Sequence, residues 1–274
     1  MKKLLAVSGG LDSMVLLHQF QDAPDVLVAH FNHGTRPSAK TDQEFVRHWA
    51  KHYQKPFFTA TAHLGEHVSE ERARAARYQF LHQVAAEQTA EIYTAHHADD
   101  LIETVIINFL RGTGWRGLAP FYNPQVHRPL LSYSKNDLRR YAAEHKIIYR
   151  EDPTNNEEHY LRNRVRAEVS RLSPFLKTEV FGRAEDQLAI RHKIEQLLAE
   201  LLQTDNFYQR AWFKNLEDTT ALELLRAILA QNNISATRPQ LHEFLSAIRT
   251  YAPGKQFNLP GGRLVRLHKD HFML

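Results

Sequence analysis

A short loop near the N-terminus contains residues that could bind an anionic ligand. The loop comprises Ser8, Gly9, Gly10, Leu11, Asp12 and Ser13, and it lies between two apolar runs. Glycines let a ligand approach the backbone closely, and free N–H groups at the start of a helix attract anions. No Gly-Lys-Ser/Thr follows, so this is not the kinase-type phosphate loop. The acid Asp12 suits a phosphate site if Mg²⁺ lies between carboxylate and phosphate. A glycine turn that only links two elements is the alternative.

A second group of polar residues precedes the apolar run at residues 105–110. Asp100 and Glu103 are three positions apart and therefore share one face of a helix. Two acids on one face repel each other unless a cation, either a metal or an ammonium group, lies between them. A charged first helical turn is the competing interpretation, and Asp99 is placed to cap that helix. The preceding pair, His96 and His97, could bind metal, but we favour contacts to phosphate or a nucleobase.

Two further groups are polar or basic. His33 could hold a nucleobase or sugar and Arg36 a phosphate, with a polar turn as the alternative. Arg162, Arg164 and Arg166 alternate along the chain. In a helix they would spread around its surface and could bind several phosphates, although a solvated basic surface would look the same.

The elements that must position these residues alternate in type through the first half. Short apolar runs at residues 4–7, 26–30, 57–60 and 92–95 predict strands, and residues 13–20, 41–53, 70–88 and 101–110 predict helices. Such alternation is typical of an α/β fold with a doubly wound parallel sheet covered on both faces. Ligands bind such sheets at the carboxyl ends of the strands, which is where these polar groups fall.

The second half has a different pattern. Residues 179–203, 219–231 and 238–250 predict helices with no strands between them, and residues 255–259 and 263–269 predict a β-hairpin around Pro260-Gly261-Gly262. Ser173-Pro174 and Gly182 suggest a boundary in this region. We therefore expect a catalytic domain at 1–176 and a mainly α-helical domain at 177–274 that ends in the hairpin.

Composition narrows the function. The 35 basic and 31 acidic residues give a formal charge of +4, which suits a polyanionic partner. Cysteine is absent, so this chain offers no thiolate metal site, Fe–S cluster or persulfide chemistry. No apolar run approaches the roughly 20 residues that span a bilayer, and the first strand leaves no room for a signal peptide. We expect a cytoplasmic protein without membrane contact.

Taken together, the motifs resemble those of the tRNA(Ile)-lysidine synthetases, a family of N-type ATP pyrophosphatases in the PP-loop superfamily. The loop at residues 8–13 alone indicates only the superfamily. Arg128-Pro129-Leu130-Leu131 also matches in order. The combination specific to the family is Asp100-x-x-Glu103-Thr104, Arg111-Gly112-Thr113-Gly114, Glu151-Asp152-Pro153-Thr154-Asn155 and Arg162-Asn163-Arg164-Val165-Arg166. The strong motifs cover residues 4–171, and one departure is Thr35, where the family usually has leucine.

The resemblance implies a Rossmann-like fold of the adenine nucleotide alpha hydrolase type and a ligase reaction. ATP would adenylate the C2 oxygen of the wobble cytidine in the CAU anticodon of tRNA(Ile), and free lysine would then displace AMP to form lysidine. It also implies a homodimer, since members are often dimers. A tRNA thiolation enzyme would need cysteine. A small-molecule PP-loop pyrophosphatase would share the loop but lack the motifs at residues 151–155 and 162–166. A non-catalytic nucleotide- or RNA-binding module would gain nothing from Asp12, Asp100 and Glu103.

The resemblance also implies roles for individual residues. Asp12 would hold Mg²⁺, and Asp100, Glu103, Asp12 and His33 would form the catalytic group. Asp100 and Glu103 would bind the lysine substrate. ATP would be bound by Ser8, Gly9, Gly10, Leu11, Asp12, Ser13, His33, Arg36 and Arg77. The tRNA would be bound by Arg111, Arg162, Arg164 and Arg166.

Overall fold

The computed structural model describes residues 1–34, 39–62, 70–150, 161–202 and 207–274. The chain divides into two compact units, Met1–Arg191 and His192–Leu274. This division falls inside the long helix α8 (Pro174–Leu201), whereas the sequence predicts a boundary between residues 176 and 177. Proline suits the first turn of a helix, so Pro174 begins α8 and does not interrupt the chain.

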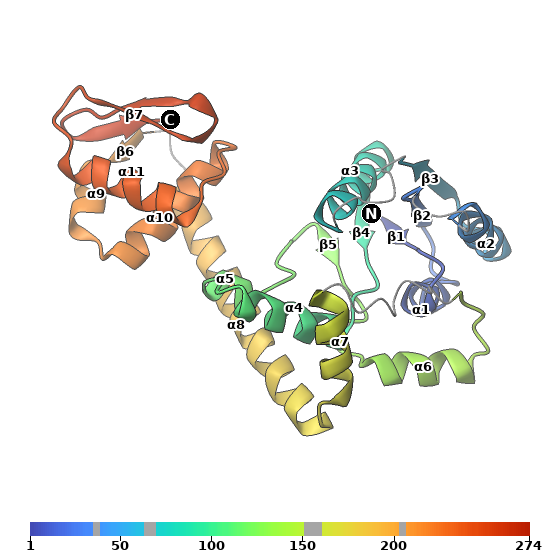
Figure 1. Ribbon diagram of the computed structural model, residues 1–274. Coiled ribbons are helices and arrows are strands. Elements are labelled where there is room, and N and C mark those ends of the chain that lie inside the picture. Colours follow the sequence, from blue (N-terminus) through green and yellow to red (C-terminus); the bar gives the residue numbers. More distant parts are fainter. Residues whose placement is uncertain (35–38, 63–69, 151–160, 203–206) are drawn as a thin grey trace. The chain divides into compact units, whose positions relative to one another are not determined.

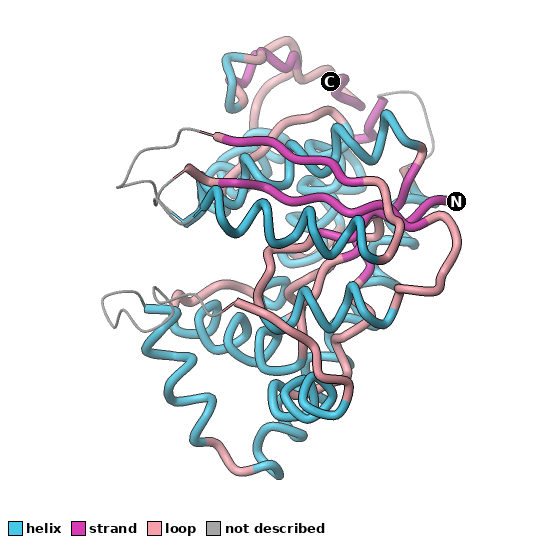
Figure 2. Tube along the Cα trace, turned by 90° about the vertical axis from the view of Figure 1, so that its right-hand side faces the viewer, coloured by secondary structure: helices cyan, strands magenta, loops and turns pink. Residues whose placement is uncertain are grey.

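The first unit contains a five-stranded parallel sheet (Figure 1). Its strands are β1 (Lys2–Ala6), β2 (Val26–Asn32), β3 (Phe57–Thr61), β4 (Ala90–Tyr93) and β5 (Val126–His127). Their order across the sheet is β3-β2-β1-β4-β5. Figure 2 shows the longer strands lying side by side in magenta. The change of direction beside β1 places the ends of β1 and β4 next to each other, where α/β sheets bind ligands.

Helices cover both faces of this sheet because side chains alternate along each strand. Leu5 packs with α1 (Leu11–Gln19), α2 (Ala39–His52) and α6 (Lys135–Glu144) on one face. Its neighbour Leu4 packs with α3 (Glu70–Gln88) on the other face. In Figure 1, α1 and α3 accordingly lie on opposite sides of the strands. The doubly wound α/β fold predicted from the sequence is thereby confirmed.

A helical layer completes the first unit. It consists of α4 (Ala98–Leu110), the short α5 (Trp115–Leu118), α7 (Leu161–Arg171) and the first turns of α8. A small core joins α4 and α7 through Ile102, Ile107, Val165 and Val169. This core fixes the acids of α4 beside the arginines of α7. The predicted strands and helices of the first half are confirmed to within a few residues, but the sequence pattern predicts neither β5 nor the helices α5 and α6.

The second unit is mainly helical. Its helices after α8 are α9 (Arg210–Asn215), α10 (Asp218–Gln231) and α11 (Arg238–Thr250). Its strands are β6 (Phe207–Gln209), β7 (Gln256–Asn258), β8 (Leu264–Arg266) and β9 (His271–Met273), with the short 3₁₀ helix η2 (Pro260–Gly262) between β7 and β8. The β7–β8 hairpin is confirmed. The expectation of no strand among the helices is wrong, because β6 precedes α9 and pairs with β9.

The core of the second unit is built on Phe213, Phe244 and Phe272, all of them fully buried. In the described ranges, no helix combines the length and the apolar character that crossing a membrane requires.

Candidate active site

The loop between β1 and α1 is organised by one buried hydroxyl. Ser13 Oγ accepts hydrogen bonds from the backbone N–H groups of Ser8 and Gly9, both at 3.1 Å, and donates to Gly10 O at 2.9 Å. Gly9 has φ +94°, a left-handed conformation that glycine adopts without strain. Ser13 therefore shapes the loop from inside, whereas the hydroxyl of Ser8 lies at its exposed side.

Leu11, the middle residue of the motif, is buried in the core that α1 shares with the sheet. Its side chain anchors the loop, so only its backbone is available to a ligand. The first N–H groups of a helix have no carbonyl one turn earlier, and those of Leu11, Asp12 and Ser13 occupy this place in α1. The loop thus presents a helix N-terminus to an anion.

Asp12 lies in a small charged cluster at the carboxyl edge of the sheet. Lys135 Nζ is 2.6 Å from Asp12 Oδ1 and 2.8 Å from Oδ2. His97 Nε2 lies 3.7 Å from Asp12 Oδ2 and 3.5 Å from Asp100 Oδ2. Burial opposes ionisation of Asp12, but His97 and Lys135 outweigh it and lower the pKa of Asp12. Burial likewise opposes protonation of His97, but the two carboxylates outweigh it and raise the pKa of His97.

Asp99 fixes the positions of the neighbouring elements. Its carboxylate accepts a hydrogen bond from the backbone N–H of Lys135 at 2.7 Å and pairs with the Lys177 ammonium of α8. Burial alone would raise the pKa of Asp99, but these partners lower it. The prediction that Asp99 caps α4 is wrong. The N-cap is His97, whose backbone N–H donates to Asp100 Oδ2 at 3.0 Å, because the helix begins one residue before Asp99.

Sequence reasoning missed Lys135. A usable signal was present, because Ser134 and Asp137 form a capping box that begins α6. That box places residue 135 in the first turn of a helix at the carboxyl edge of the sheet.

A pocket of about 270 Å³ gathers several residues that the sequence predicts as functional. Its lining includes His33, Arg77, Asp100, Arg162 and Arg166, which come from four separate parts of the chain. Arg74 and His96 also line it. Guanidinium groups bind phosphate and carboxylate oxygens, so this pocket suits an anionic ligand next to one acid.

Glu103 lies three positions along α4 from the pocket residue Asp100 and is almost fully buried. Arg166 Nε contacts its Oε1 at 3.2 Å, while Glu103 Oε2 is buried and has no hydrogen-bond partner among the residues that the structure describes. Burial raises the pKa of Glu103 despite the opposing charge of Arg166. Arg166, predicted to bind tRNA, therefore contacts one of the predicted lysine-binding acids. An unsatisfied buried carboxylate oxygen is costly, and it is the kind of atom that an incoming cation would satisfy.

His96 is held neutral. Burial lowers its pKa well below the ordinary value, and Arg128, Arg77 and Arg74 lower it further. Its Nδ1 lies 2.9 Å from Thr94 Oγ1. A neutral imidazole beside arginines suits hydrogen bonding to a ligand.

The remaining predicted residues lie in different surroundings. Arg162 Nη2 is 3.4 Å from Thr104 Oγ1, while Arg164 is exposed on another face of α7. Arg111 is exposed at the C-terminus of α4, where Gly112 has φ +65°. Arg36 and the Glu151-Asp152-Pro153-Thr154-Asn155 motif lie outside the described residues. Just before that motif, Arg150 donates its backbone N–H to Gly9 O at 3.0 Å.

The donor set limits the kind of metal that fits. In the described ranges, no group of three or more His, Asp or Glu side chains could hold a metal ion. Mg²⁺ is commonly bound by one or two carboxylates together with substrate phosphates. Asp12 lies beside the helix N-terminus, so it could bind Mg²⁺ as the single carboxylate while the substrate supplies phosphate oxygens.

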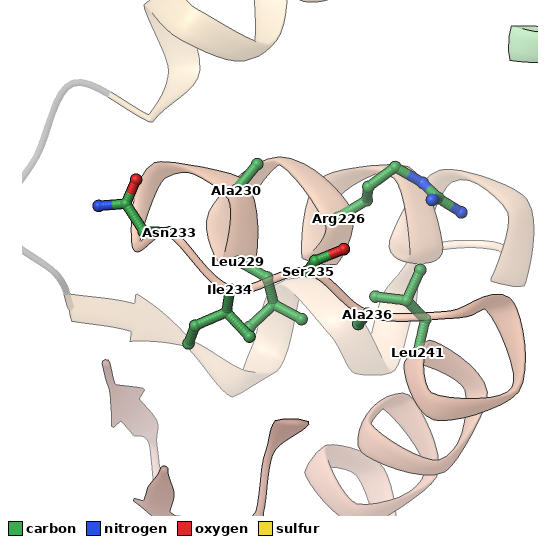
Figure 3. Close-up of a pocket in the computed structure, with 8 residues that line it drawn as sticks. All are labelled: Arg226, Leu229, Ala230, Asn233, Ile234, Ser235, Ala236 and Leu241. Atoms are coloured by element: carbon green, nitrogen blue, oxygen red, sulfur yellow. The ribbon is translucent and has the colours of Figure 1, made fainter. Parts of the chain in front are cut away.

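A second pocket, of about 360 Å³, lies in the C-terminal unit (Figure 3). Its eight lining residues come from α10, α11 and the connection between them. Arg226 is its charged residue, and the remainder is largely aliphatic. None of the residues predicted to be functional lines it.

Comparison with known proteins matches residues 1–173 to the PP-loop domain family. The tRNA(Ile)-lysidine synthase of Parasynechococcus marenigrum is 31% identical over 295 residues, covering 99% of this chain and 88% of that protein. That of Exiguobacterium sibiricum is 39% identical over 180 residues, covering 63% of this chain and 43% of that protein. The chain thus spans less than half the length of some curated relatives.

Among solved structures, the U34-tRNA thiolase NcsA of Methanococcus maripaludis has a similar fold. Its TM-score is 0.57 at 18% identity, covering 69% of this chain and 73% of that one.

Proposed function

The chain belongs to the tRNA(Ile)-lysidine synthase family of PP-loop proteins, and from this premise we propose that it forms lysidine. The substrates would be ATP, free lysine and a tRNA(Ile) with a CAU anticodon. The observation that carries the proposal is the arginine-rich pocket that joins His33, Arg77 and Asp100 to α7.

The reaction has two steps. First, the C2 oxygen of the wobble cytidine bonds to the α-phosphorus of ATP, the bond from that phosphorus to the bridging oxygen breaks, and pyrophosphate leaves with the electron pair. Second, the ε-amine of lysine bonds to C2 and loses a proton. The C2–O bond then breaks, and the oxygen leaves on AMP.

The residues of the site divide this work. The loop at residues 8–13 would bind the pyrophosphate portion through its helix N-terminus. His33 and Arg77 would contact the nucleotide, as residues that line the same pocket. Asp12 would hold Mg²⁺, which supplies charge neutralisation at the phosphates when bound.

The lysine substrate carries two ammonium groups and one carboxylate at neutral pH. Asp100 and Glu103 supply the negative charge for an ammonium, and the unsatisfied Oε2 of Glu103 supports this assignment. Arg162 and Arg166 supply positive charge at the same pocket. We assign tRNA phosphate contacts to the exposed Arg164 and Arg111, and to Arg162 and Arg166 where the pocket opens.

Sulfur transfer is the nearest rival within this fold, because the M. maripaludis neighbour is a thiolase with a [4Fe-4S] cluster. The present chain has no cysteine to hold such a cluster. The acids of α4 instead favour an amine as the second substrate.

The test is incorporation of labelled lysine into a tRNA(Ile) transcript with a CAU anticodon, with and without ATP. Methionine tRNA, which also reads CAU, is the control. We expect ATP-dependent labelling of the isoleucine transcript alone. Absence of labelling in both would contradict the proposal. We further propose a homodimer in the cytoplasm, and the molar mass in solution tests the dimer.

A further inference from the structure

We propose that Lys135 is a phosphate-binding residue that contacts ATP at the loop and stabilises the departing pyrophosphate. This inference rests on the proposed adenylation step. In that step the breaking bond leaves its electron pair on pyrophosphate, so negative charge develops where the loop and Asp12 lie. A positive group at this place lowers the barrier if it approaches the phosphates more closely as that charge forms.

The position of Lys135 carries the argument. Its ammonium contacts both carboxylate oxygens of Asp12, in the first turn of α1. It therefore lies beside the N-terminus of that helix, where an anion would bind. The side chain of Lys135 is 32% exposed and that of Asp12 28% exposed, so the pair is open to solvent.

The backbone of Lys135 is held more firmly than its side chain. Its N–H donates to the buried Asp99, and the capping box of Ser134 and Asp137 fixes the start of α6. Asp99 is in turn paired with Lys177 of α8. A fixed backbone beneath a flexible four-carbon stem lets the ammonium move over a short range without moving the helix.

Binding of ATP would change the contact between Lys135 and Asp12. A Mg²⁺ ion held by Asp12 would compete with the Lys135 ammonium for the same carboxylate oxygens and would repel it. The phosphates provide new acceptors near the same helix terminus. Lys135 then exchanges a carboxylate partner for phosphate oxygens, and its charge remains paired in both states.

The test measures binding of inorganic pyrophosphate by titration calorimetry, with a chelator present to remove metal ions. It distinguishes direct contact between Lys135 and phosphate from an effect of the protein's net charge. The variants are Lys135→Met, Asp12→Asn and the double variant. The double variant has the same net charge as the unsubstituted protein. Arg139→Met is the matched control, because Arg139 is exposed on the same helix and its loss changes the charge equally.

We expect Lys135→Met to weaken pyrophosphate binding at least tenfold, and Arg139→Met to change it less than twofold. The double variant should remain at least fivefold weaker than the unsubstituted protein, because the contact itself is missing. Equal affinity of the double variant and the unsubstituted protein would overturn the proposal, as would no pyrophosphate binding by the unsubstituted protein. Melting temperatures confirm that each variant is folded.

Turnover gives an independent measurement. Lys135→Met should lower kcat for AMP formation about a hundredfold, with a smaller change in KM for tRNA. Lys135→Arg, which keeps the positive charge, should retain part of this kcat. If the unsubstituted protein fails to incorporate lysine while its pyrophosphate binding still depends on Lys135, the proposed function fails and the phosphate role stands. Normal turnover by Lys135→Met would contradict the phosphate role alone.

Discussion

Glu103 is a carboxyl group on which burial and pairing act in opposite directions. Burial favours its neutral form and dominates, which raises its pKa, while Arg166 favours the charged form. Its Oε1 contacts Arg166, whereas its Oε2 has no hydrogen-bond partner among the described residues. A second cation would resolve this imbalance, and under the proposed function the lysine substrate would provide it.

Replacing Glu103 should therefore affect one substrate selectively. We expect Glu103→Gln to raise KM for lysine at least tenfold and KM for ATP less than twofold, measured by steady-state kinetics. Glu168→Gln on α7 is the control, because Glu168 is exposed and pairs with Arg171 in its own helix. Equal changes in both KM values would contradict the lysine-binding assignment.

The raised pKa of Glu103 has its own consequence for lysine binding. As pH falls, Glu103 becomes protonated and loses its attraction for an ammonium at a higher pH than an ordinary glutamate would. KM for lysine should increase on mild acidification in the unsubstituted protein and depend less on pH in Glu103→Gln. An identical pH profile in the two proteins would contradict this role.

Asp12 is the residue on which adenylation should depend most. We expect Asp12→Asn to lower AMP formation at least a hundredfold, since an amide holds Mg²⁺ poorly, with tRNA affinity unchanged within about twofold. Release of AMP and filter binding of tRNA measure the two quantities. Normal ATP-dependent turnover in Asp12→Asn would exclude the role.

Motif residues of this kind can be read from sequence because their types and spacing are local. Asp12, Asp100 and Glu103 each follow or begin an element that the apolar pattern predicts. Their partners cannot be read in the same way. Lys135 meets Asp12 across 123 positions of chain, and Arg166 meets Glu103 across 63, so only tertiary packing brings them together.

At the scale of elements, the carboxylate of Asp99 joins three helices. Asp99 belongs to α4, the N–H of Lys135 to α6 and the ammonium of Lys177 to α8. The carboxylate is only 8% exposed, so little solvent screens this connection. This charge therefore links α4, α6 and α8 in addition to the apolar core of the helical layer.

We expect Asp99→Asn to lower the free energy of unfolding by about 3 kcal/mol at neutral pH, because it leaves Lys177 unpaired. The pKa of Asp99 is lowered in the folded state, so its stabilisation is present above the ordinary value of 3.8 and is lost as pH falls through the folded-state value. Denaturant unfolding at several pH values should show the variant and the unsubstituted protein converging in acid. A constant difference at every pH would contradict this account.

Helix α7 presents its arginines in two directions. Arg162 and Arg166 line the pocket and Arg164 is exposed. We expect tRNA binding to weaken steeply with salt, and Arg164→Gln to weaken it a few-fold and reduce the salt slope by about 1, with KM for lysine unchanged. Arg139→Gln is the control for loss of an exposed charge. A salt slope unchanged by Arg164→Gln would remove Arg164 from the tRNA interface.

Some helices and strands can be predicted from the sequence and others cannot. The 19 residues of α3 match the predicted span because its ends coincide with changes in pattern. The two residues of β5 are too short to show any period, and they are a strand only because β4 pairs with them. For β6 the partner β9 is likewise remote, so pairing and not propensity decides its conformation.

At the scale of the whole molecule, the two units have separate cores. In the second unit, the buried Arg210 donates to the carbonyl oxygens of Ile248, Tyr251 and His268, each at 2.8 Å. No composition rule predicts a buried arginine. Its guanidinium supplies donors to three carbonyls, two at the C-terminal end of α11 and one between β8 and β9.

We expect Arg210→Met to destabilise the second unit by about 3 kcal/mol, since one buried and two partly buried carbonyls lose their donor. Hydrogen exchange should speed up across residues 207–274 and remain slow in β1, β2 and β4. Arg266→Met on the exposed side of β8 should change neither region. Equal acceleration in both units would show that they unfold together.

Leu4 and Leu5 are buried on opposite faces of the sheet, and this constrains insertions and deletions in β1. Each belongs to a different core, and only three positions separate Leu5 from Ser8. Insertion of one residue between Leu5 and Ser8 would either exchange the faces of both leucines or, if the leucines stay in place, shift the loop by about 3.3 Å. Exchanges among aliphatic residues leave the register intact and usually cost under about 1.5 kcal/mol. Over evolutionary time, this strand should therefore tolerate substitutions far more readily than insertions or deletions.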